Sequence, residues 1–168
     1  MKGEPVADSR LETLSRILVE YSLDVQPHQL VTIGGSTLAA PLIRAVYRRV
    51  IERGAYPVPQ ISLPGLSEIF YGKANDDQLR FIRPDEHIMP EQADAALSIL
   101  SDANTKALSG VDPARQQLAR QARADLTKRY LERSAAGELK WCVTLFPTNA
   151  FAQDAEMSLS DYEEFVYS

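Results

Sequence analysis

The stretch that decides the fold is Leu30-Val31-Thr32-Ile33-Gly34-Gly35-Ser36-Thr37. Its first four residues are apolar or β-branched and predict a short strand, and the glycine pair predicts that the strand ends in a turn. A hydroxyl from Ser36 or Thr37 can cap a following helix, and Pro41 suits the first turn of that helix. Apolar residues recur at helical spacing as far as Gly54, a typical helix stop. The stretch therefore predicts a strand, a tight turn and an amphipathic helix.

Three further segments predict strands, and helical segments separate them. The expected strands are 60–63, 95–100 and 139–146, and the expected helices are 9–21, 36–54, 66–71, 76–82, a turn within 84–90, a long helix over 112–137 and a last helix from 158. Ser9 and Glu12 have the spacing of a capping box for the first helix. Pro57 and Pro59 argue against a central strand before residue 60. Strands separated by helices form parallel pairs, so we predict an α/β fold with a mainly parallel sheet of about four or five strands and helices on both faces.

Length and composition indicate one globular unit, and we expect a single α/β domain over 1–168. Hydrophobic residues make up 45% of the chain and charged residues 24%, as in ordinary globular proteins. The net charge of -5 disfavours nucleic acid or an anionic membrane as a partner. A lone cysteine, Cys142, cannot form an intrachain disulfide, which favours a reducing, cytoplasmic location. No apolar run is long enough to predict a membrane span.

Two local patterns could carry chemistry, and each has a simpler interpretation. Backbone amides around Gly34-Gly35 could hold an anion, but neither dinucleotide nor P-loop spacing is present, so a tight turn is favoured. His87 and Glu91 are four residues apart and could share a metal on a helix, although Pro90 would disturb that helix. His28 lies in a turn without obvious partners. We interpret both histidines as surface residues, because a metal needs three or four convergent ligands.

Charged clusters near the carboxyl end of the chain are also open to two interpretations. The long helix carries the basic residues Arg115, Arg120, Arg123, Lys128, Arg129 and Arg133. They could bind phosphates, but a solvated outer face or a subunit contact is favoured. Asp161 and Glu163 are explained by helix capping, whereas Asp154 and Glu156 are not. Cys142 is interpreted as a core residue, and no Ser/His/Asp set can be assembled with two poorly placed histidines.

Four separated blocks resemble the thermophilic metallo-aminopeptidase family typified by aminopeptidase T. They are Leu18-Val19-Glu20-Tyr21-Ser22-Leu23, Gly35-Ser36-Thr37-Leu38-Ala39-Ala40-Pro41-Leu42, Asn104 to Pro113, and Thr144-Leu145-Phe146-Pro147-Thr148 with Ala152 to Ser158. The resemblance implies a cytoplasmic, homodimeric exopeptidase that removes N-terminal residues from a peptide substrate. It also implies a pair of divalent metals, zinc or cobalt and in some members magnesium, that activate a bridging water.

The same resemblance limits what this chain can do. The family's metal ligands lie in the carboxyl-terminal half, so the resemblance covers only the amino-terminal portion, and we expect the metal-binding domain to be absent. The unfinished last helix also predicts truncation. We therefore predict no catalytic residue, no metal ligand and no bound cofactor in this segment, which would be inactive alone and would contribute a cavity wall and dimer contacts. His28 and His87 do not replace the missing ligands.

The segment that the resemblance places nearest the active cavity is Asp154-Ala155-Glu156-Met157. We therefore expect Gln153, Asp154, Glu156 and Met157 to be substrate-pocket residues, with Glu156 standing where relatives often have glycine. Two alternatives remain open. The chain could be a non-catalytic α/β module for dimerisation or small-ligand binding, or it could bind a nucleotide at Gly34-Gly35.

Overall fold

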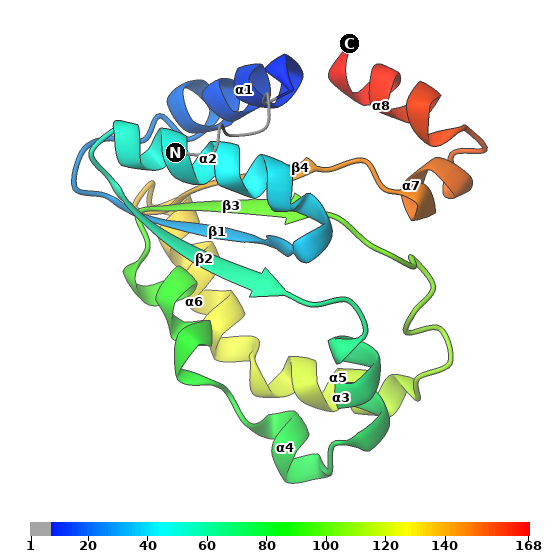
Figure 1. The fold of residues 1–168 in the computed structure, drawn as a ribbon. Helices are drawn as coiled ribbons and strands as arrows, with labels where there is room; N and C mark the ends of the chain where they lie inside the picture. Colours follow the sequence, from blue (N-terminus) through cyan, green and yellow to red (C-terminus); the bar gives the residue numbers. More distant parts are fainter. Residues whose placement is uncertain (1–7) are drawn as a thin grey trace, which may run out of the picture.

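The computed structural model describes residues 8–168, which form a four-stranded, all-parallel sheet in the order β2-β1-β3-β4 (Figure 1). The strands are β1 (Leu30–Ser36), β2 (Tyr56–Ser62), β3 (Ala95–Leu100) and β4 (Lys140–Leu145). The predicted α/β class and parallel sheet are confirmed, with four strands. The chain moves outward from β1 to β2, then returns to the other side of β1 for β3 and β4. This reversal leaves a topological switch point between β1 and β3.

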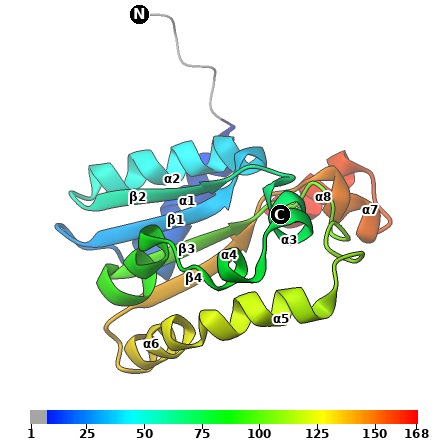
Figure 2. The ribbon, with the colours of Figure 1, turned by 90° about the horizontal axis from the view of Figure 1, so that it is seen from below.

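Helices cover both faces of the sheet, as predicted (Figure 1). They are α1 (Ser9–Arg16), α2 (Ala40–Glu52), α3 (Leu66–Lys73), α4 (Asp76–Arg80), α5 (Pro113–Ala122), α6 (Ala124–Ala135), α7 (Asn149–Asp154) and α8 (Leu159–Tyr167). Single turns of other helix types continue α1 over Ile17–Ser22 and occupy Pro84–His87 and Ile88–Gln92. The helices α1 and α2 lie on one face, and α5 and α6 lie on the other (Figure 2). Within residues 8–168, no helix has the length and apolar character needed to cross a bilayer.

The two faces bury very different amounts of apolar surface. On the α1–α2 face, Val31, Ile33 and Leu97 pack with buried residues of α2 in a large apolar cluster. On the α6 face, the cluster of fully buried residues is small and centres on Leu139. Since burial of apolar area is the main stabilising term in folding, most of the stability comes from the α1–α2 face.

The strand β1 is longer than predicted, because Gly34 and Gly35 lie within it rather than in a turn. Both glycines pair with β2 and β3. A Cβ at Gly35 would lie 3.2 Å from Ile43 Cδ1 and 3.3 Å from the carbonyl oxygen of Ile99. The glycine is therefore needed for close packing between the sheet and α2. Ser36 does cap the following helical turn, since its hydroxyl accepts from the amide of Leu38, as predicted.

The strand β2 begins at Tyr56, four residues before its predicted start. The amide of Tyr56 donates to the carbonyl of Gln29, which precedes β1. Because amides of alternate residues point to alternate sides of a strand, Pro57 and Pro59 occupy positions whose N–H would point away from β1. The prolines therefore leave the pairing with β1 intact. The two prolines predict that this segment is not a central strand, and β2 is indeed an edge strand.

The predicted long helix is two helices, α5 and α6, which meet at Arg123. Arg123 leaves the helical conformation, with φ -94° and ψ 7°. At the other helix ends, Ser158 caps α8 as predicted, whereas α1 is capped by Asp8 rather than by Ser9. The short helix α7 was not predicted.

Candidate functional site

A crevice of about 300 Å³ lies at the carboxyl ends of β1, β2 and β3. It is lined by Ser36, Ser62, Leu63, Pro64, Gly65, Leu66, Ser67, Glu68, Ser101, Asp102, Ala103, Asn104, Thr105, Ala107 and Leu108. Open parallel sheets bind ligands in the crevice outside the carboxyl ends of their strands, next to the topological switch point. The crevice occupies this position, because it includes the residues that follow β1 and β3 on either side of the switch. Side chains with hydroxyl, amide or carboxylate groups share its lining with apolar ones in nearly equal measure.

A pair of serines closes the floor of the crevice between β1 and β3. The hydroxyl of Ser36 donates to the carbonyl of Ser101 at 2.7 Å, and the amide of Ser36 donates to the hydroxyl of Ser101 at 3.2 Å. The two hydroxyl oxygens lie 2.8 Å apart, and only 4% of Ser101 is exposed. Both hydroxyls are therefore engaged in joining the two strands. Neither has a histidine as its hydrogen-bond partner, so the pair lacks the base that a serine nucleophile needs.

Asp154 lies beside this crevice. Its carboxylate accepts a hydrogen bond of 2.6 Å from the hydroxyl of Thr105, which is one of the lining residues, and lies 3.9 Å from the ammonium group of Lys106. Asp154 ends α7, whose first turn is capped by Thr148. The contact brings two distant parts of the sequence together, the loop after β3 and the segment after β4. The exposed carboxylate is thus held against a residue that lines the crevice.

None of the four predicted pocket residues is itself among the lining residues, and the other three surround Asp154 in sequence. Glu156 has a φ of 56°, a left-handed conformation that favours glycine. This conformation explains why a glycine is expected in its place. The amide of Glu156 donates to the carbonyl of Gln153, and that of Met157 donates to the carbonyl of Ala152. These bonds end α7 in a tight turn, and among the four candidates the structure brings only Asp154 into contact with a lining residue.

The histidines have partners but do not form a cluster. His87 Nδ1 lies 2.7 Å from Glu91 Oε1, so the predicted neighbours do meet even though Pro90 interrupts the regular helix. Both side chains are exposed. His28 Nδ1 lies 3.1 Å from the hydroxyl of Tyr56, at the amino-terminal edge of the sheet, opposite the crevice. Nowhere in residues 8–168 do three or more His, Cys, Asp or Glu side chains gather as a metal would require.

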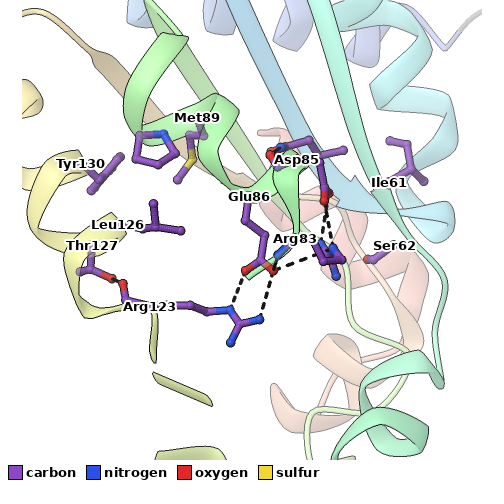
Figure 3. A pocket seen from close by; sticks show the side chains of 12 residues that line it. Ile61, Ser62, Arg83, Asp85, Glu86, Met89, Arg123, Leu126, Thr127 and Tyr130 are labelled. Atoms are coloured by element: carbon purple, nitrogen blue, oxygen red, sulfur yellow. Dashed lines mark hydrogen bonds and ion pairs between the residues drawn. The ribbon is translucent and has the colours of Figure 1, made fainter. Parts of the chain in front are cut away.

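A second cavity, of about 430 Å³, lies between β2, the turns over 84–92, and α6 (Figure 3). Arg123 crosses it and donates to both carboxylate oxygens of Glu86, at 2.6 and 3.0 Å. The same guanidinium donates to the carbonyls of Leu79, Phe81 and Ala119. All five of its N–H groups are thereby engaged. Arg123 is thus a structural residue that fixes the junction of α5 and α6.

The charge of Glu86 is favoured by this arrangement. Burial opposes its ionisation, but the hydrogen bonds from Arg123 and from the amide of Arg83 outweigh burial and lower the pKa of Glu86 below its ordinary value. Arg83 in turn pairs with Asp85. The charges in the second cavity therefore neutralise one another, and none is left to recognise a charged ligand.

The prediction of a solvated basic face on α5 and α6 is wrong for Arg123 and for two other arginines. Arg115 donates to the carbonyls of Tyr71 and Ala74 and so attaches α3 to α5. Arg133 is only 8% exposed and donates to the carbonyls of Pro90 and Glu138. Arginine can satisfy several backbone carbonyls at once, so a basic side chain on a helix can point inward without losing its hydrogen bonds. The exposed Arg120, Lys128 and Arg129 do match the predicted outer face.

Cys142 is only partly buried, although it was interpreted as a core residue. It packs at the margin of the large apolar cluster because β4 ends the sheet.

The crevice at the switch point is typical of ligand-binding α/β domains, and the fold is shared with a solved structure. Wild-type AmpT from Thermus thermophilus superposes with a TM-score of 0.73 at 18% identity, over 95% of this chain and 42% of that chain. The sequence is 27% identical to Aminopeptidase 2 of Geobacillus stearothermophilus over 173 positions, which covers 93% of this chain and 39% of that protein.

The sequence profile of the thermophilic metalloproteases, family M29, matches residues 7–168. The chain belongs to this family. The resemblance deduced from the sequence is thus confirmed. The chain spans about two fifths of the length of the relatives it matches. Among residues 8–168, no three His, Cys, Asp or Glu side chains lie together as donors for the metal that the family description implies.

The sequence did not identify Ser36 and Ser101 as a pair or Thr105 as a partner of Asp154. A signal was available for the serines, because residues that follow neighbouring parallel strands meet at one edge of the sheet. No comparable signal links Thr105 to Asp154, since that contact depends on where α7 packs.

Proposed function

We propose that this chain is the amino-terminal α/β portion of a metallo-aminopeptidase that releases N-terminal residues from peptides. The observation that carries the proposal is the family match, which extends over residues 7–168 while the chain corresponds to only 39% of Aminopeptidase 2. In this proposal, the metal ligands belong to the remaining part of the enzyme. The present residues form one wall of the substrate cavity and contribute contacts to a cytoplasmic homodimer. The divalent metal would be zinc, cobalt or magnesium.

The polar groups at the crevice could bind a peptide substrate. Asp154 presents an exposed carboxylate beside Thr105, and an aminopeptidase must recognise the ammonium group at the start of its substrate. A carboxylate attracts an ammonium group, and the surrounding hydroxyls can accept or donate hydrogen bonds to a peptide backbone. Asp154 is therefore proposed as a substrate-positioning residue. Gln153, Glu156 and Met157 shape the same wall through the turn that ends α7.

The first test measures activity of the isolated chain. We expect no hydrolysis of Leu-p-nitroanilide in the presence of cobalt or zinc, because residues 8–168 do not provide three metal donors in one place. Turnover that is robust and that a chelator abolishes would contradict the proposal.

The second test uses a chimera in which this chain replaces the matching region of Aminopeptidase 2. We expect the chimera to hydrolyse Leu-p-nitroanilide, and Asp154→Ala to raise KM by about threefold or more with a smaller change in kcat. Asp125→Ala removes another exposed carboxylate, on α6, and serves as the matched control. An unchanged KM for Asp154→Ala would remove Asp154 from the substrate site.

A further inference from the structure

The two edges of the sheet differ in their capacity to accept another strand. On β2, the outward positions include Pro57 and Pro59, which have no N–H to donate. On β4, Lys140 donates to the carbonyl of Asp94, and Phe146, just after the strand, donates to the carbonyl of Leu100. The alternation of amides along a strand then points the N–H groups of the intervening odd-numbered residues away from β3. The β2 edge is blocked, whereas the β4 edge presents free donors on its outer side.

An apolar surface adjoins the β4 edge. Trp141 is 55% exposed and Val143 is 50% exposed, and the register places them opposite Ala96 and Ser98 of β3. Leu100, two residues beyond Ser98, lies on the same face and is also 50% exposed. Parallel sheets are normally covered on both faces, so three large apolar side chains at this corner indicate a missing cover.

Nothing along β4 resembles the devices that protect natural sheet edges. The strand has no proline and no bulge, and its single charged residue, Lys140, is paired with Asp24 at 2.9 Å. An edge with free donors, regular pairing and apolar side chains is a template for strand addition. We call the outer edge of Lys140–Leu145, together with the side chains of Leu100, Trp141 and Val143, the open β4 surface.

We propose that the open β4 surface is the docking site for the remaining part of a metallo-aminopeptidase polypeptide, which adds a strand to β4 and covers the three apolar side chains. More than half of each relative lies outside the matched region, so the family carries ample polypeptide to supply this cover. The docked segment would be extended, would pair its main chain with β4, and would direct apolar side chains at Trp141 and Val143. This inference rests on the proposed function, because it assumes that the chain works within such an enzyme.

The test compares hydrogen exchange of the 139–146 segment in the isolated chain and in the Aminopeptidase 2 chimera. We expect the outward amides of Trp141, Val143 and Leu145 to exchange rapidly in the isolated chain and at least about tenfold more slowly in the chimera. Val143→Pro removes one outward donor and leaves the bonds to β3, as the prolines of β2 do. It should abolish the added protection, whereas the control Val143→Thr, which keeps the N–H, should preserve it.

Each outcome decides the proposal. A folded, metal-binding chimera whose 139–146 segment exchanges as in the isolated chain would overturn it, and so would a chimera that cannot fold around this graft. Protection in the isolated chain that rises with protein concentration would assign the surface to a second copy instead, and would also overturn it. Protected 139–146 amides in a chimera without peptidase activity would support docking and contradict the proposed function. Peptidase activity without that protection would support the proposed function and contradict docking.

Discussion

A single arginine lies at the point where the long predicted helix divides. Arg123 lies where α5 and α6 meet and binds Glu86 together with three backbone carbonyls. Its five N–H donors join Glu86 and the carbonyls of Leu79 and Phe81 to the junction of the two helices, where its own backbone leaves the helical conformation. The sequence pattern showed a continuous apolar face, and nothing in it distinguished Arg123 from the exposed arginines nearby.

We expect Arg123→Leu to lower the free energy of unfolding by about 1–3 kcal/mol, because it leaves carbonyls and the Glu86 carboxylate without a partner. Arg120→Leu, at an exposed position on the same helix, should change stability by less than about 0.5 kcal/mol. Urea denaturation of the two variants provides the comparison.

The stabilisation by Arg123 also depends on pH, because the pKa of Glu86 is lowered from its ordinary value of 4.5. The stabilisation is complete above that pH and shrinks as pH falls through the folded-state pKa. Equal effects of both substitutions would refute the structural role of Arg123.

The adjacent glycines of β1 provide a matched pair of probes for packing. A Cβ at Gly35 would come within 3.4 Å of Ile43 and Ile99, whereas at Gly34 its nearest neighbour is the carbonyl oxygen of Leu97 at 3.7 Å. We expect Gly35→Ala to destabilise the protein by about 1–3 kcal/mol through overpacking. Gly34→Ala should be tolerated. Thermal unfolding of both variants tests this difference, and a larger loss for Gly34→Ala would contradict it.

At the scale of elements, the sequence predicted the existence and order of the strands well, because β-branched runs bounded by turn residues give a strong local signal. It placed β3 without error and put the ends of β1 and β2 in the wrong place. Those ends depend on pairing with neighbours, which no local pattern contains. The helix α7 is only six residues long, too short for a periodic signal.

The last helix, α8, packs against the first through an aromatic contact. The guanidinium carbon of Arg10 in α1 lies 5.0 Å from the centre of the Tyr167 ring in α8. Burial and the neighbouring Glu163 raise the pKa of Tyr167 to about 12, from an ordinary value of 10.0, although Arg10 acts in the opposite direction. A raised pKa means that docking of α8 favours the neutral phenol.

We therefore expect α8 to remain docked below pH 10 and to lose this contribution as pH rises towards about 12. The difference in tyrosinate absorbance between the unmodified protein and Tyr167→Phe gives the titration of this one residue. Glu163→Gln should shift that titration to lower pH, because it removes a negative charge. A titration at the ordinary pKa would show that α8 does not bury Tyr167 in solution.

At the scale of the whole molecule, the candidate site was only partly predictable. The substrate-pocket role of Asp154 stays a prediction; the structure shows its carboxylate bonded to Thr105, which lines the crevice. The crevice itself follows from strand order, since Ser36 and Ser101 meet only because β1 and β3 are neighbours. Strand order is a global property, and a list of strands and helices leaves it undetermined. Neither the strand order nor the crevice identifies a reaction. Among residues 8–168, no three side chains gather as donors for the metal that the family description implies.

The unequal cores of the two faces lead to a prediction about how the molecule opens. Val31, Ile33 and Leu97 belong to the large cluster under α1 and α2, so their amides should exchange only through global unfolding. The α6 face has few fully buried apolar residues, so α6 should open in a separate step of lower free energy. Leu139→Ala should lower the opening free energy of α6 by about 2–4 kcal/mol, and Leu97→Ala should lower that of the whole molecule by a similar amount. Native-state hydrogen exchange at increasing urea concentration measures both energies. If all amides of the unmodified protein exchange with one common opening free energy, α6 does not open separately, and this prediction is contradicted.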